Sequence, residues 1–106
     1  MLLMTKLKNA IKSQLPNAEF FLKNININGV KRGCSGFIKY DDVIVYVNTE
    51  TTLVSGLMYR YAKNLKDYTG CKNMWVPEKD NKYTDAIVDA LKNRINYLNE
   101  IYYTKG

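Results

Sequence analysis

The chain has 106 residues, of which 46% are hydrophobic and 25% are charged, and its formal net charge is +6 without any histidine. These values argue against a disordered chain and suit one globular domain spanning residues 1–106. Without histidine the chain cannot form a Ser-His-Asp triad, a Cys-His pair or a histidine metal site.

The positive charge is concentrated near the start of the chain. The first 40 residues contain seven basic residues and one acidic residue, which accounts for the whole excess. Such a local excess either improves solubility or favours encounter with an anionic partner such as nucleic acid.

The cysteine content and the hydropathy indicate in which cellular compartment the protein is expected. Cys34 and Cys71 form neither a disulfide framework nor a zinc-binding spacing, which fits a reduced environment. The first ten residues do not resemble a signal peptide, and no run approaches the ~18 apolar residues of a membrane span. We therefore expect a cytoplasmic protein that makes no membrane contact.

Residues 2–14 are predicted to form an amphipathic helix. An apolar residue recurs at every fourth position, whereas the lysines lie off that stripe. The two sets are Leu3, Leu7, Ile11 and Leu15, and Lys6, Lys8 and Lys12. Pro16 should end the helix, because proline disfavours helical geometry at the preceding residue.

Three strands are predicted next, at residues 19–27, 30–40 and 43–47. Asn28-Gly29 is the strongest short signal for a two-residue hairpin turn, and Asp41-Asp42 is a second candidate. The three strands should therefore form an antiparallel meander.

The turns set a register, which assigns each side chain to one face of the sheet. One face is apolar and should be the core: Phe21, Ile25, Ile27, Val30, Cys34, Ile38, Val43, Val45 and Val47. On the other face Phe20, Phe37 and Tyr46 form a row, with Lys31 and Lys39 beside them. A bulge at Gly33 would exchange the two faces beyond it.

The second half of the chain contains two further elements. Residues 53–69 follow helical spacing, although "GLMYRYA" within them would also serve as a fourth strand. Residues 70–81 are predicted to form a loop whose Trp75 plugs the core. Residues 82–102 should form a long helix with Ile87, Leu91, Ile95 and Leu98 buried. The expected fold is α+β: a three-stranded antiparallel meander, an N-terminal helix and a long C-terminal helix.

No segment predicts catalysis. Gly33-Cys34-Ser35-Gly36 has neither the nucleophile-elbow nor the P-loop spacing. In the predicted register Cys34 faces the core, where thiols are usually inert. The Asp41-Asp42 carboxylates suit a turn better than a metal site. Tyr59-Arg60-Tyr61 lacks the basic residues that would support a tyrosine nucleophile. We expect no enzyme activity, no metal and no cofactor.

The aromatic and basic sheet face is the candidate interface. Bases of a single strand stack on aromatic rings while lysines meet phosphates. The predicted contact residues are Phe20, Lys31, Arg32, Phe37, Lys39 and Tyr46, with Lys6, Lys8 and Lys12 as further phosphate contacts. Two alternatives stay open: a helix covers this face and makes the aromatics core, or the face binds a protein.

The segments "NGVKRGCSGFI", "VYVNTE" and "YRYAKNLKDYTG" together resemble small accessory proteins of mobile genetic elements in AT-rich Gram-positive bacteria, over about residues 28–70. The resemblance implies an accessory role in DNA replication, or a counter-defence role. We therefore predict a non-catalytic protein that binds nucleic acid, with single-stranded DNA favoured, or a polymerase, primase or helicase, or both. The alternative is a small inhibitor that blocks a host or defence enzyme through a protein interface.

Overall fold

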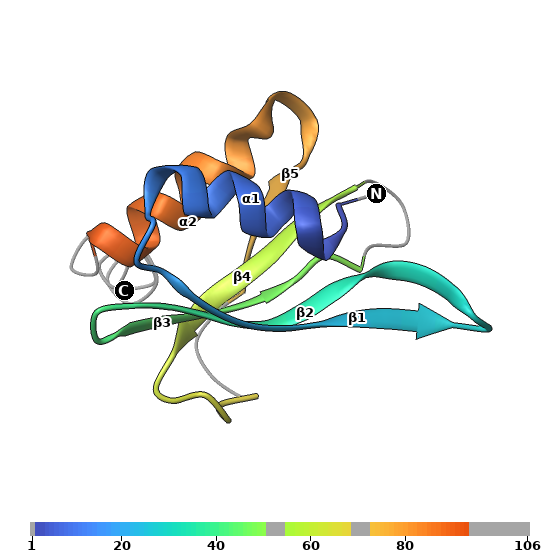
Figure 1. Ribbon diagram of the computed structural model, residues 1–106, viewed down its shortest axis with the longest axis horizontal. Coiled ribbons are helices and arrows are strands. Elements are labelled where there is room, and N and C mark those ends of the chain that lie inside the picture. Colours follow the sequence, from blue (N-terminus) through green and yellow to red (C-terminus); the bar gives the residue numbers. More distant parts are fainter. Residues whose placement is uncertain (1, 51–54, 69–72, 94–106) are drawn as a thin grey trace.

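The computed structural model describes residues 2–50, 55–68 and 73–93. Within these ranges, two α-helices and an antiparallel sheet of five strands, in the order β1-β2-β3-β4-β5, make an α+β fold. Figure 1 shows both helices on the same face of the sheet. The elements in chain order are α1 (Met4–Gln14), β1 (Glu19–Ile27), β2 (Val30–Tyr40), β3 (Val43–Asn48), β4 (Gly56–Ala62), β5 (Met74–Pro77), the 3-10 helix η1 (Lys79–Asn81) and α2 (Lys82–Lys92).

Helix α1 follows the predicted amphipathic pattern. Leu7 and Ile11 are fully buried, and Leu15, just beyond the helix, is buried as well. The helix ends at Gln14, one residue before Leu15, because Pro16 disfavours helical geometry there. The predicted N-terminal helix with one buried stripe is confirmed.

Two-residue turns join β1 to β2 and β2 to β3, as predicted. Asn28 and Gly29 both have positive φ, +53° and +79°, which is the requirement of a type I′ turn. Asp41 in the second turn has a φ of +54°. The strand residues that flank each turn pair directly with one another.

A β-bulge in β2 changes which side chains of β1 face the helices. Asn26 pairs with Lys31, but Ile25 pairs with Gly33, so that Arg32 is an extra residue on β2. Beyond the bulge, every pair of β1 with β2 is shifted by one residue from the predicted register. A one-residue shift moves each side chain of β1 to the other face of the sheet.

The predicted pairing of Phe20 with Phe37 is therefore wrong, because Phe21 pairs with Phe37. Phe20 instead packs against the core on the helix side. The predicted core face is confirmed for Cys34, Ile38, Val43, Val45 and Val47, whereas Ile25 is only half-buried and Phe21, Ile27 and Val30 are exposed.

Thr49, directly after β3, holds the bulge in place. The Cys34 N–H donates a hydrogen bond to Thr49 Oγ1 (2.8 Å), and the Thr49 hydroxyl donates to the Leu2 carbonyl (2.7 Å). A Cβ atom on Gly33 would lie 2.6 Å from the same oxygen, so only glycine leaves room for it. Gly33-Cys34-Ser35-Gly36 is therefore a structural joint between β2, Thr49 and the N-terminal segment.

The chain after β3 adds two strands to the predicted meander, so the expected sheet of three strands is corrected to five. The helix predicted over residues 53–69 is wrong, and β4 lies there, as the alternative interpretation of "GLMYRYA" allowed. Leu57 and Arg60 lie on opposite faces of β4 and are both buried, so this strand has no polar face that would reveal its period. The loop predicted over residues 70–81 contains β5.

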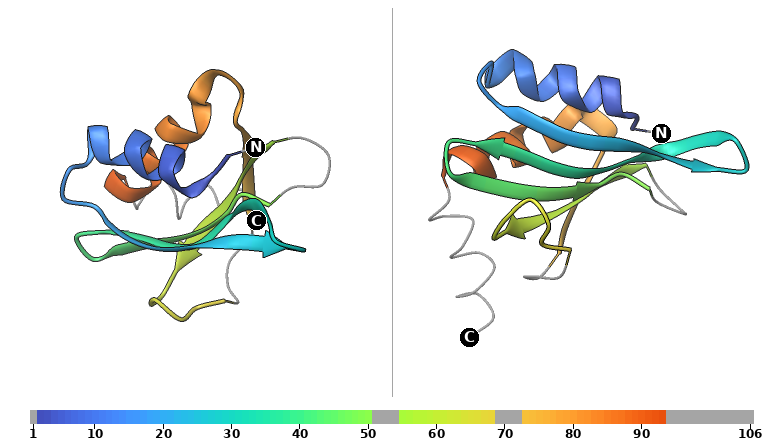
Figure 2. Two further views of the ribbon diagram at one scale, coloured as in Figure 1. Left: turned by 45° about the vertical axis from the view of Figure 1, so that its right-hand side comes forward. Right: turned by 60° about the horizontal axis from the view of Figure 1, so that its bottom comes forward.

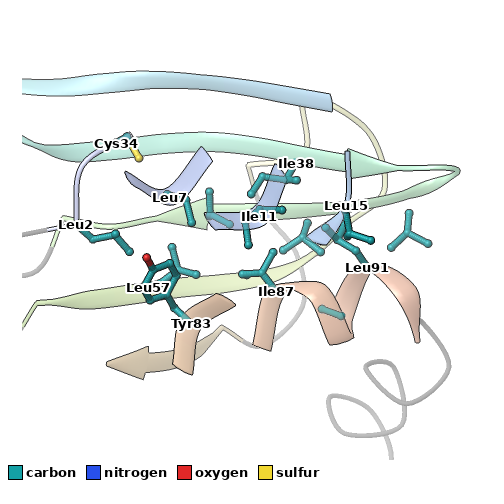
Figure 3. Close-up of a cluster of buried hydrophobic side chains, with 14 residues drawn as sticks. Leu2, Leu7, Ile11, Leu15, Cys34, Ile38, Leu57, Tyr83, Ile87 and Leu91 are labelled. Carbon is teal, nitrogen blue, oxygen red and sulfur yellow. The ribbon is translucent and has the colours of Figure 1, made fainter. Parts of the chain in front are cut away.

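The main core lies between the sheet and the two helices. Figure 3 shows Leu7 and Ile11 of α1 and Tyr83 and Ile87 of α2 gathered in front of the sheet, close to Ile38 of β2. All five side chains are almost completely buried. The sheet face toward α1 and α2 is therefore covered by these helices and forms the core.

Helix α2 confirms the predicted C-terminal helix where the structure describes it. Ile87 and Leu91 are buried as predicted. Ile95 and Leu98, and the rest of the predicted helix beyond residue 93, lie outside the described residues. Neither of the described α-helices is long and apolar enough to cross a membrane.

Candidate nucleic-acid interface

We call the sheet face opposite α1 and α2 the open face. Two rows of paired residues cross it: Lys23–Ser35–Asn48–Met58–Trp75 from β1 to β5, and Phe21–Phe37–Tyr46–Arg60 from β1 to β4. The right-hand view of Figure 2 brings this side of the molecule forward. In the described ranges no helix lies on it, and residues 63–68 cross it at one end (Figure 1).

The exposed large apolar side chains of the described residues all lie on this side. Phe21, Ile27 and Val30 belong to the β1–β2 hairpin, Trp75 belongs to β5, and Tyr68 contacts the rings of the open face. Their exposed fractions are 43%, 44%, 54%, 50% and 64%. Side chains of these types usually lie inside a soluble domain. Their position on one side makes the open face the candidate interface.

Trp75 differs from its prediction. Half of the side chain is exposed, so it does not plug the core. Its indole instead packs against Gly56, where a Cβ atom would lie 2.5 Å from the ring. Gly56 therefore leaves room for the indole, and half of the Trp75 side chain is exposed to solvent.

Phe37 and Tyr46 form an aromatic cluster with Tyr68. The Phe37 ring centroid is 5.3 Å from those of Tyr46 and Tyr68, and both contacts are edge to face. Phe37 is only 2% exposed, so its ring offers no free surface to a base. Tyr68 is the exposed member of the cluster.

Arg60 holds residues 63–68 against the cluster. Its guanidinium carbon lies 4.6 Å from the Tyr46 ring centroid, and its Nη2 donates a hydrogen bond to the Asp67 carbonyl (2.6 Å). The Asp67 carboxylate accepts a hydrogen bond from the Lys63 N–H (2.9 Å). Asp67 therefore closes the loop formed by residues 63–68. The Arg60 guanidinium stabilises this loop and is not available to a ligand.

Several other cations border the open face. Lys23 and Arg32 are exposed and lie at the β1–β2 end, and Lys39 is half-buried with Glu19 directly opposite it. Lys31 is exposed on the reverse side of the hairpin, beside Asn26. The predicted basic contacts Lys31, Arg32 and Lys39 thus lie around the sheet edge, but not all on one side.

The lysines of α1 are placed elsewhere. Lys6 forms an ion pair with Glu78, with 2.8 Å between Nζ and Oε2, and Lys8 lies 5.9 Å from the Phe20 ring centroid. Lys12 is exposed. Because α1 covers the helix side of the sheet, these three lysines and Phe20 are separated from Phe37 and Tyr46. The structure does not bring the predicted contact residues together as one surface.

The position of Cys34 disfavours covalent chemistry at its thiol. Cys34 is fully buried, and burial raises the pKa of its thiol, while the Thr49 hydroxyl opposes this less strongly. A raised pKa disfavours the reactive thiolate. The described ranges contain no group of three Cys, Asp or Glu residues that could hold a metal ion.

Sequence reasoning missed Phe21, Lys23, Tyr68 and Trp75 as surface residues of one face. The predicted register assigns Phe21 to the core face, because it treats the bulge only as a conditional alternative, and it lists Lys23 on neither face. In the sequence, Gly33 is the residue that signals a possible bulge at this point of the strand. Trp75 was missed because β5 has only four residues, too few for a periodic pattern.

Searches against models of protein families, curated proteins and solved structures found no match to this chain.

Proposed function

We propose that the protein binds single-stranded nucleic acid, with single-stranded DNA as the first candidate, across its open face. The observation that supports this is the gathering of exposed aromatic rings, Phe21, Tyr68 and Trp75, on one side of a sheet whose rim carries Lys23 and Arg32. Bases stack on aromatic rings and phosphates pair with cations, and both contacts depend little on the nucleotide sequence.

The spacing of the rings suits an extended ligand. Phe21 on β1 and Trp75 on β5 are separated by four strand spacings, about 19 Å at ~4.8 Å each. One base cannot contact both rings, so they would anchor different nucleotides of one strand. Met58 and Asn48 lie between them in the sheet and offer an apolar and a hydrogen-bonding contact.

The net charge supports the same kind of ligand. An excess of +6 attracts a polyanion, and the resemblance to accessory proteins of mobile elements supports a role beside a replication enzyme. In this proposal the chain is a non-catalytic accessory protein, and a polymerase, primase or helicase would act on the strand that it holds.

Adjacent phenylalanines on β1 provide the test. Phe21 lies on the open face and Phe20 on the helix side. Phe21→Ala should weaken binding of a labelled oligothymidine about 5- to 150-fold, because one stacked base contributes ~1–3 kcal/mol. Phe20→Ala is the matched control and should leave the affinity unchanged, provided that circular dichroism shows both variants folded.

Two further readouts belong to the same titration. The chain has one tryptophan, so quenching of its fluorescence on binding would report stacking at Trp75 directly. The slope of log affinity against log salt should fall by about 0.7 in Lys23→Gln, one phosphate contact fewer. No binding to single strands at low salt, or equal loss in the Phe20 and Phe21 variants, would overturn the proposal.

A further inference from the structure

The tip of the β1–β2 hairpin carries two apolar side chains that belong to neither core cluster. Ile27 and Val30 flank the Asn28-Gly29 turn, pair with each other across the strands, and are about half exposed. Figures 1 and 2 show this hairpin extending beyond the end of α1. Leaving two aliphatic side chains in water forgoes favourable burial. The tip therefore offers a small apolar surface to a partner.

The charge of the hairpin indicates the kind of ligand. Residues 23–32 contain Lys23, Lys31 and Arg32 and no acidic residue. None of these three cations forms an ion pair with a residue that the structure describes. Lys31 and Arg32 follow Val30 directly; Lys31 pairs with Asn26, and Arg32 is the extra residue of the bulge. The apolar side chains of such a tip could contact bases, and the cations beside them could contact the phosphates on either side.

The tip is also continuous with the open face. Alternation along β1 places Phe21, Lys23, Ile25 and Ile27 on the same side, over about 20 Å at ~3.4 Å per residue. A single strand that leaves the Phe21 ring toward the hairpin passes Lys23 and Ile25 before it reaches Ile27. The tip therefore lies where a bound single strand would continue into a duplex.

We propose that Ile27 and Val30 form a wedge against the last base pair at a junction of single-stranded and duplex DNA, while Lys31 and Arg32 contact the phosphates of the duplex. Apolar side chains inserted at a base step unstack it, and flanking cations offset the cost. This inference rests on the proposed function, because the single-stranded part of the junction is the strand held on the open face.

The test compares an oligonucleotide alone with the same oligonucleotide as the tail of a duplex, in both tail polarities. The chain should bind one tailed duplex about tenfold more tightly than the free tail, from the partial burial of two aliphatic side chains. A 2-aminopurine at the terminal pair of the duplex should become brighter, because it is unstacked. A blunt duplex should bind weakly.

The double variant Ile27→Thr and Val30→Thr removes the apolar wedge while it keeps the β-branched side chains that favour the strands. We expect it to bind the free tail within twofold of the unmodified chain and to lose both the junction preference and the 2-aminopurine signal. Asn26→Thr, on the reverse side of the same hairpin, is the matched control and should retain both.

The outcomes separate the two proposals. If the free tail is bound but tailed duplexes bind no better, or if the double variant keeps the preference, the wedge is wrong and the open-face proposal stands. If the free tail is not bound at low salt, the proposed function itself is wrong.

Discussion

Thr49 joins three parts of the chain through a single hydroxyl. It accepts a hydrogen bond from Cys34, donates one to Leu2, and lies 3.8 Å from the Cys34 sulfur. The residue is almost fully buried, so each of these groups would be costly to leave without a partner. This oxygen explains why a glycine stands at position 33, because a Cβ atom there would lie 2.6 Å from it.

Gly36 is a position at which β1 and β2 leave no room for a side chain. Its φ is +145°, and a Cβ atom would meet the Phe21 carbonyl and come within 2.9 Å of Leu22 Cα. Gly36→Ala should lower the free energy of unfolding by at least ~2 kcal/mol, because it adds backbone strain to a clash that neither strand can relieve. Urea denaturation measures the effect. Gly29→Asn has open space around it and adds only the strain of a positive φ, so it should cost less stability than Gly36→Ala and is the control.

At the scale of elements, the bulge determines which side chains of β1 face the helices and which lie on the open face. Without it, Phe21 and Ile27 would face the helices and Phe20 would join the open face. With the extra residue at Arg32, the core receives Phe20 and Leu22, while Phe21 becomes a surface ring. The candidate interface therefore depends on one inserted residue in the neighbouring strand.

Residues 63–68 depend on a different element, β4, because Arg60 holds their Asp67 carbonyl. Arg60→Lys keeps the charge but loses the planar guanidinium that both stacks on Tyr46 and donates this bond. We expect a loss of ~1–3 kcal/mol in the free energy of unfolding, measured by urea denaturation. Lys66→Ala, at an exposed position on the same segment, should change stability by no more than ~0.5 kcal/mol, and a comparable loss there would contradict this role for Arg60.

The whole molecule is asymmetric in its described residues: α1 and α2 cover one sheet face, and residues 63–68 cover part of the other (Figure 1). On the helix side, Lys6 of α1 forms an ion pair with Glu78, which follows β5 directly. This pair links the first helix to the segment that leads into α2. The hydrogen bond from Lys6 lowers the pKa of Glu78, and the same pair raises the pKa of Lys6.

This ion pair predicts a dependence of stability on pH. A carboxyl whose pKa is lower in the folded chain than in the unfolded chain stabilises the fold above the unfolded value of ~4.3. Its contribution is lost as the pH falls from there through the lowered folded pKa. Unmodified protein should therefore be more stable than Glu78→Gln at pH 7, and the difference should shrink below pH ~4.3. Thermal melts at several pH values would show it, and a difference that persists unchanged at low pH would contradict the assignment.

The sequence by itself determined the features that depend on neighbouring residues. The stripe of α1, the stop at Pro16, both two-residue turns and the inward direction of Cys34 follow from periodicity and local backbone preference, and the structure confirms them. The α+β class followed from these elements.

Only the tertiary structure decided the rest, because it depends on contacts between distant residues. The bulge at Arg32 requires room beside Gly33 for the hydroxyl of Thr49, which lies sixteen positions further along the chain. The strand at β4 is buried on both faces, so its pattern could not be distinguished from a helix until β3 and β5 flanked it. The side of the sheet that carries the exposed rings was settled by those pairings, and not by any short stretch of residues.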